Sequence, residues 1–269
     1  MITLLFGIGA GFGAFAASFW GGDFGMGWSL TLALVGFMVF QFASGHFIQK
    51  RVKRDMERVQ GILTEGQKRL QMKMQRWQIR PPGSVQAAQK EIFEDTKIFV
   101  REAIKETEVL QRYKLWVPMI ERQIATAQLQ LYWMIKEFKV VDKLLPKAMM
   151  IDPTMLAMKM ARMYMLKEPL AKIEKVYNKG VARVKYNGNV LLAATWSWML
   201  VKNGEIDRAF KALTEALKKS DNATLKANHE NLMNNRVGHF SNSGIGDMWY
   251  SLMLEEPRVR TQRQHSVYR

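Results

Sequence analysis

The chain has 269 residues, a formal net charge of +16 and no cysteine. The lack of cysteine excludes disulfides, thiolate nucleophiles and cysteine-ligated zinc or iron–sulfur centres. All 40 lysine and arginine residues lie at Lys50 or beyond, and the only acidic residue before that point is Asp23. This partition predicts that residues 1–49 occupy a different solvent from the rest of the chain.

Two apolar runs lie in this uncharged part. They cover Ile2 to Trp20 and Trp28 to Phe47, are 19 and 20 residues long, and are joined by the turn sequence GGDFGMG. A hydrocarbon core about 30 Å thick needs roughly 20 helical residues, so each run is long enough to span a membrane once. The sequence therefore predicts a transmembrane helical hairpin over residues 1–49.

The small residues of AFAAS leave a second interpretation of the first run, a cleaved signal peptide. That interpretation requires a positively charged start, which only the α-amino group supplies. The topology is the same in both cases, because KRVKR at 50–54 directly follows the second run and cationic flanks are retained in the cytoplasm. We expect a membrane protein with its C-terminal part in the cytoplasm, in a bacterial inner membrane.

Small residues in the first run indicate close helix packing. Two overlapping small-xxx-small pairs allow an approach to the second run or to another subunit, which leaves a homo-oligomer open. The pairs are formed by Gly7, Gly9, Gly11 and Gly13. Trp20 and Trp28 bracket the turn, where aromatic rings lie at the membrane interface.

Residues 50–80 are expected to form a long basic helix beside the membrane, with ten basic and three acidic residues. Spacings of three and four predict one apolar, packed stripe, consisting of Val52, Met56, Val59, Ile62 and Leu63. Basic residues nearest the membrane are expected to contact anionic lipid head groups, at about 1 kcal/mol each. These are Lys50, Arg51, Lys53, Arg54 and Arg58.

RPPGS at 80–84 ends that helix, because proline lacks a backbone donor and clashes with the preceding turn. Ser84 can cap a new helix in the connector, residues 81–118. Its apolar positions follow a near-heptad course that predicts helix-on-helix packing within the chain or between chains. They are Ile92, Phe93, Phe99, Val100, Ala103, Ile104 and Leu110.

No residue set for catalysis is found in the sequence. The histidines have no metal-ligand spacing, HExxH and GxxxxGK[ST] are absent, and the glycines of the first run lack the context of a dinucleotide loop. The histidines are His46, His229, His239 and His265. We therefore expect neither an enzyme nor a cofactor or metal site.

Helical patterns in the second half repeat every 34 residues, as marked by Ala148, Ala182 and Ala216. Such a period, filled with helix pairs, resembles the tetratricopeptide repeat family. The resemblance implies repeats at about 122–155, 156–189 and 190–223, and an all-α fold in which a helical solenoid follows the hairpin and the basic helix. Alanine-rich amphipathic helices can imitate the same pattern.

The third unit matches the family pattern best, through Ala193, Trp196, Leu200, Gly204, Ala209, Leu213 and Ala216. The first unit offers Tyr132, Ala148 and Pro153. The middle unit departs from the pattern, because Lys175 and Lys179 stand where packed residues are expected. Its second helix is therefore expected to be shifted or irregular.

The resemblance further implies a concave groove formed by the first helix of each pair. Position by position, the candidate groove residues are Gln130, Trp133, Met134, Tyr164, Lys167, Trp198 and Lys202. Aromatic and lysine side chains suit an extended acidic or amphipathic peptide. The aromatic residues can equally be core, in which case alanine at Trp133 and Trp198 would reduce helicity rather than partner capture.

The predicted repeat domain covers residues 119–256. A capped helix follows Asp221 and closes the array, and Asp247 can cap a short last helix. Trp249, Leu252 and Met253 of that helix are expected to dock on the array. Residues 257–269 are expected to form a disordered basic tail with Arg258, Arg260, Arg263 and Arg269.

Two functions follow from this layout. The first is a membrane-anchored cytoplasmic scaffold that binds one or more proteins in a membrane or envelope assembly. The order of two spans, a basic stretch and repeats resembles bacterial HemY-type membrane proteins, which supports the location. The alternative is nucleic-acid or ribosome binding through the basic surface, although positive-inside topology already accounts for the cluster at 50–54.

Overall fold

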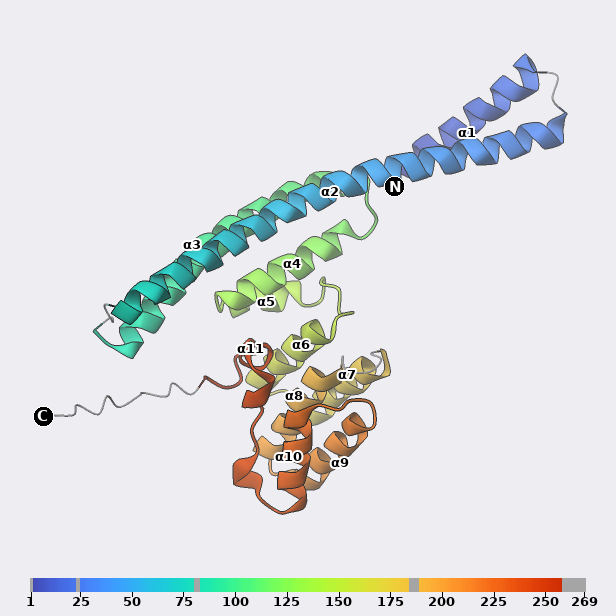
Figure 1. Cartoon of the computed structure of the whole chain (residues 1–269). Helices are drawn as coiled ribbons and strands as arrows, with labels where there is room; N and C mark the ends of the chain where they lie inside the picture. The colour runs from blue at the N-terminus through green and yellow to red at the C-terminus, as the bar shows by residue number, and fades with distance from the viewer. Residues whose placement is uncertain (1, 23–24, 80–82, 184–188, 258–269) are drawn as a thin grey trace, which may run out of the picture. The chain divides into compact units, whose positions relative to one another are not determined.

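The computed structural model describes residues 2–22, 25–79, 83–183 and 189–257 (Figure 1). These residues form helices and no strand. The chain divides into two compact units, Met1–Met149 and Met150–Arg269, and each is described by itself. Residues 23–24 of the predicted turn, residues 80–82 of RPPGS, and residues 258–269 of the predicted tail lie outside the described residues.

The first unit begins with a helical hairpin. Helix α1 (Ile2–Gly21) packs along the first half of α2 (Met26–Ile79), as Figure 1 shows. Both helices are long and apolar enough to cross a membrane, and most of that apolar surface is exposed. The second apolar run and the basic stretch, which the sequence treats as two segments, form one continuous helix.

Two of the four glycines in α1 bring the helices together. A Cβ atom at Gly11 would lie 3.0 Å from the carbonyl oxygen of Ala33, and one at Gly7 would lie 3.1 Å from the ring of Phe37. A Cβ atom at Gly9 or Gly13 would meet nothing within 4 Å. The Gly7 and Gly11 pair therefore packs within the chain.

Helix α3 (Val85–Val109) returns along the second half of α2 (Figure 1). The Ser84 hydroxyl accepts the Ala87 N–H at 3.1 Å, which confirms the predicted cap. The core between the helices contains Val59, Phe99, Val100, Ala103 and Ile104. The predicted apolar stripes of both helices therefore pack against each other within one chain.

The chain then returns to the end of the apolar half of α2. The 3₁₀ helix η1 (Leu110–Tyr113) and α4 (Ile120–Met134) bury four apolar residues against Ile48, Val52 and Met56. The four are Leu110, Tyr113, Ile120 and Ile124. Helix α5 (Phe138–Leu144) packs on α4 and completes the helices of this unit.

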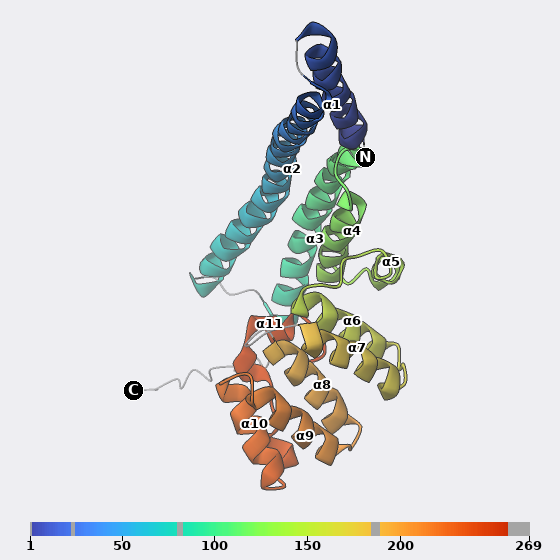
Figure 2. The same ribbon diagram turned by 90° about the vertical axis from the view of Figure 1, so that its right-hand side faces the viewer.

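The second unit consists of helix pairs, α6 (Pro153–Met165) with α7 (Leu170–Arg183) and α8 (Val190–Lys202) with α9 (Ile206–Leu217), as Figure 2 shows. Helix α10 (Ala223–Met233) packs on α9. Two 3₁₀ turns, η3 (Val237–His239) and η4 (Ser243–Ile245), precede the four-residue helix α11 (Asp247–Tyr250). The core centres on α8, in which Leu191 to Leu200 are all buried.

The helices that lead each pair, and α10, end in the same way. A residue with positive φ follows each of them, at Lys136, Lys167, Gly204 and Asn235. The next residue donates its N–H to a carbonyl five residues back, as in Glu137 to Tyr132 (3.0 Å) and Glu205 to Leu200 (2.9 Å). Each helix therefore ends in a Schellman-type turn, which redirects the chain into the following segment.

The buried positions of the third predicted unit agree with the sequence pattern, since Gly204 forms the turn and the other six residues are buried. The middle unit differs in register. Ala182 is exposed, and Gly180 is buried instead, where a Cβ would lie 3.0 Å from Leu192. Lys175 and Lys179 lie on the exposed face of α7. The first helices begin at Ile120, Pro153, Val190 and Ala223, so their spacing is not a strict 34 residues.

Candidate functional site

The face formed by α6 and α8 holds the C-terminal segment Gly246–Glu255 of the same chain. The ring of Trp198 lies edge-on to Tyr164 of α6 (centroids 5.5 Å apart) and to Trp249 of α11 (5.7 Å). Trp249 and Leu252 are fully buried, which confirms that this segment docks on the helix pairs. The helix itself is shorter than predicted, and Asp247 is its first residue rather than its cap.

One carboxylate joins the segment to this face. Glu255 accepts the indole N–H of Trp198 through Oε1 (2.7 Å) and that of Trp249 through Oε2 (2.9 Å). Charged acceptors form stronger hydrogen bonds than neutral ones, and each buried indole N–H is thereby satisfied. Lys202 Nζ lies 5.3 Å from the centre of the Trp198 ring, at the edge of the same cluster. An aromatic and acidic peptide segment thus occupies part of the predicted groove.

The predicted groove residues differ in exposure. Trp133 and Trp198 are buried, so the core interpretation describes both rings. Tyr164 is half-buried, and the polar or flexible candidates are exposed, namely Gln130, Met134, Lys167 and Lys202. The residues of α4 belong to the first unit and the other four to the second.

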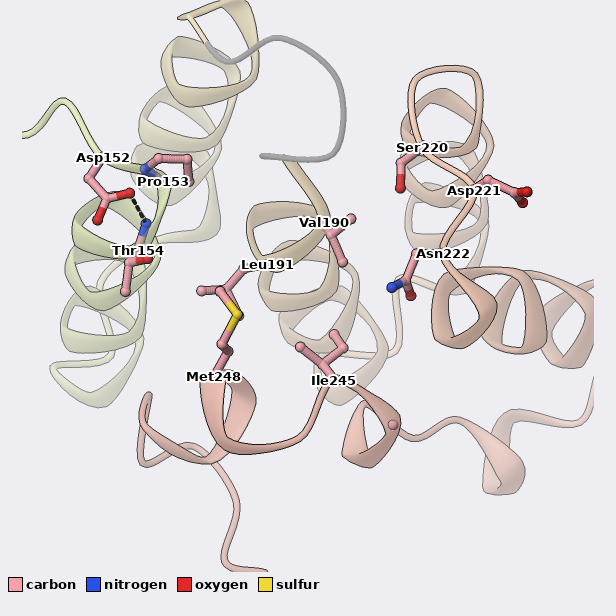
Figure 3. A pocket seen from close by; sticks show the side chains of 11 residues that line it. Asp152, Pro153, Thr154, Val190, Leu191, Ser220, Asp221, Asn222, Ile245 and Met248 are labelled. Carbon is pink, nitrogen blue, oxygen red and sulfur yellow. Dashed lines mark hydrogen bonds between the residues drawn. The ribbon is translucent and has the colours of Figure 1, made fainter. Parts of the chain in front are cut away.

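A hollow of about 470 Å³ lies where the N-termini of α6, α8 and α10 meet (Figure 3). Asp152 caps α6 by accepting the Thr154 N–H (3.3 Å), and Asn222 caps α10. The Asp221 carboxylate pairs with Lys226 and points away from the hollow. Because these side chains are engaged in capping or pairing, they do not form a pair of carboxylates for acid–base catalysis.

The first unit contains a polar cluster just after the apolar half of α2. Asp55 is 1% exposed and accepts hydrogen bonds from Tyr113 Oη (2.8 Å) and from Arg112. Arg58 Nη1 lies 3.7 Å from the other carboxylate oxygen. Burial raises the pKa of Asp55, but the hydrogen bonds from Tyr113 and Arg112 and the charges of Arg112 and Arg58 outweigh it and lower the pKa. The cluster fixes η1 onto α2.

All five basic residues predicted to contact lipid are exposed. Lys53 pairs with Glu57 (3.9 Å), and Arg58 pairs with Asp55 and with Glu106 (3.9 Å). The Arg51 guanidinium lies 4.9 Å from the centre of the Phe47 ring. Lys50 and Arg54 form no ion pair with the described residues.

Sequence reasoning missed Arg112 and Trp116, which the structure places beside Arg51 and Arg54. These residues are more than 55 positions apart in the sequence, and no local pattern joins them. The apolar stripe of α2 was the only available signal, since it required some partner element at this level.

Among the described residues, no group of three potential metal-ligating side chains is found. His229 stacks on Phe210 (centroids 4.4 Å apart), and its Nε2 lies 3.0 Å from Thr214 Oγ1, so this histidine has a packing role.

Comparison with protein-family models, with curated proteins and with solved structures found no match to this chain. What is shown is an all-helical chain with two helices long and apolar enough to span a membrane.

Proposed function

We propose that this protein is a membrane-anchored, tetratricopeptide-like scaffold that faces the cytoplasm and binds a partner protein in a membrane assembly. In this proposal α1 and the first half of α2 form the anchor. Their exposed apolar side chains favour this, since soluble proteins rarely expose contiguous apolar surface of such length. The bacterial inner membrane and the HemY-like layout remain parts of the proposal.

The observation that carries the scaffold role is the peptide segment already held on the face of α6 and α8. Trp249 and Glu255 occupy it by stacking and by charge-assisted hydrogen bonds. A partner segment with an aromatic and an acidic residue is complementary to the same face, with Lys167 and Lys202 exposed at the ends of the two helices. Peptide recognition in helical repeats uses such concave first-helix faces.

The test is purification of the intact chain in mild detergent, followed by identification of the accompanying protein. Charge reversal in Lys167→Glu/Lys202→Glu is expected to remove that protein, because it repels an acidic segment. Lys211→Glu/Lys219→Glu changes the same charge on α9 and is expected to retain it. Equal loss in both variants would contradict a specific site.

The same purification tests the nucleic-acid alternative. RNA that accompanies the chain and is released steeply with rising salt, in the absence of a defined protein, would favour that function and overturn the scaffold proposal.

A further inference from the structure

Three separate segments of the first unit meet at one level, the start of α1. The Ile2 N–H donates to the carbonyl oxygen of Leu115 (3.0 Å). The ring of Trp116 stacks on Phe6 of α1, with centroids 6.4 Å apart and planes 5° apart. The loop between η1 and α4 therefore lies beside the first turns of a helix whose 20 residues span about 30 Å.

This loop exposes apolar side chains. Leu115 is 57% exposed, Met119 is 53% exposed, and Trp116 is 37% exposed. They adjoin the exposed apolar surface of α1, so one continuous apolar surface extends from the hairpin onto the loop. Tryptophan is enriched where such a surface reaches the head-group region of a bilayer.

A hollow of about 420 Å³ opens next to Trp116. Its lining contains three guanidinium groups and no acidic residue, namely Arg51, Arg54 and Arg112 together with Phe47, Ile48, Tyr113 and Trp116. Asp55 lies buried behind it and pairs with Arg112. Arg51 and Arg54 form no ion pair with the described residues, so this side of the hollow keeps a net positive charge.

We propose that this hollow binds the phosphate of an anionic phospholipid, with Arg51 and Arg54 on the phosphate and Trp116 and Leu115 against the glycerol and upper acyl chain. Guanidinium groups bind phosphate oxygens bidentately, which distinguishes a built site from a diffuse basic surface. The apolar continuity with α1 selects a lipid over a free anion. This inference rests on the proposed membrane anchor and adds a specific lipid to it.

Native mass spectrometry of the intact chain in mild detergent, mixed with equal amounts of phosphatidylglycerol and phosphatidylcholine, tests the site. The unmodified chain is expected to retain phosphatidylglycerol preferentially. Arg51→Gln/Arg54→Gln is expected to lower that preference by about 30-fold, the effect of removing two basic residues at an anionic surface. Lys68→Gln/Arg69→Gln removes the same charge farther along α2 and is expected to keep the preference.

A third variant, Arg112→Lys, keeps the positive charge beside Asp55 and removes the planar guanidinium, so a smaller loss of preference is expected. Circular dichroism of each variant checks that helicity is unchanged. Equal losses in the two double variants, no preference in the unmodified chain, or release of the lipid by excess inorganic phosphate would each overturn the site.

Failure of the anchor is measured separately, by reconstituting the chain into phosphatidylcholine vesicles and washing them with alkaline carbonate. A chain that washes off would contradict the proposed membrane anchor. A chain that stays in the vesicles but shows no lipid preference would contradict only the site.

Discussion

At the level of single residues, Asp55 shows how one buried charge holds two distant segments together. Its carboxylate receives Tyr113 Oη and Arg112 from η1, more than 55 residues away in the sequence. Asp55→Asn would leave these donors with a weaker, neutral acceptor. We expect a loss of about 2 kcal/mol, typical of a hydrogen bond to a charged group, and a fall of roughly 4–8 °C in the thermal midpoint in detergent.

The pKa of Asp55 gives this prediction a pH dependence. The folded-state pKa lies below the ordinary value of 3.8, so the stabilisation is complete above pH about 4 and is lost as the pH falls through the lowered pKa. The difference in thermal midpoint between the unmodified chain and Asp55→Asn should therefore be constant near neutral pH and shrink in acid. Glu57→Gln, an exposed change on the same helix, should have little effect at either pH.

A second residue-level prediction concerns Trp198, whose side chain is 6% exposed. Trp198→Ala removes two aromatic contacts and leaves Glu255 with only one of its indole partners. We expect a destabilisation of about 3–5 kcal/mol, as for other large-to-small changes in a core, measured as the thermal midpoint by circular dichroism. Trp20→Ala, at a position 78% exposed, is the control in detergent. Similar midpoints for the two variants would show that the Trp198 ring does not contribute as core.

The Trp198 case also marks a limit of prediction from sequence. Helical spacing placed this ring on the first-helix face of its repeat, and α8 is indeed the first helix of a pair. The partners that bury the ring, Trp249 and Glu255, lie about 50 residues later in a segment without regular pattern. Local periodicity assigns a residue to a face, but it does not show what returns to cover that face.

At the level of elements, the glycines of α1 give a prediction with an internal control. Gly7→Leu/Gly11→Leu would place side chains against Phe37 and the Ala33 carbonyl, and should separate α1 from α2. Gly9→Leu/Gly13→Leu changes the same residue types on an open face and should leave the hairpin intact.

The lack of cysteine makes this measurable by disulfide trapping. A Cβ at Gly36 would lie 3.0 Å from Cβ of Ala14, so Ala14→Cys/Gly36→Cys should cross-link α1 to α2 on oxidation. Cross-linking is expected to fall sharply in the Gly7 and Gly11 background only. Equal cross-linking in both backgrounds would count against close packing at these glycines.

Element-level prediction succeeded where sequence and packing agree and failed where one residue shifts the register. The stripes of α2 and α3 and the third helix pair follow helical periodicity, because each buries one continuous apolar face. In α7 the small residue that permits close packing is Gly180, two positions before the alanine that marks the period. A strict period places the helices but does not select which of two neighbouring small residues is buried.

At the level of the whole molecule, charge and apolar surface are separated along the chain. Every lysine and arginine lies at or beyond Lys50, whereas the exposed apolar side chains of the hairpin lie before it. Because α2 is continuous across this boundary, the change of solvent occurs within one helix and needs no hinge. The basic half of α2 must therefore lie on the side of the membrane where cationic flanks are retained.

This argument predicts the accessibility of single cysteines introduced into the intact chain. A cysteine in place of Gly25, before α2, should react with a membrane-impermeant maleimide from outside intact cells, since it lies at the far end of the hairpin. A cysteine in place of Lys218, after α9, should react only once the membrane is permeabilised. Both sites are exposed and Lys218 lies at a helix end, so neither change should perturb packing. Labelling of the Lys218 site from outside would reverse the proposed topology and place the peptide-holding face of α6 and α8 away from cytoplasmic partners.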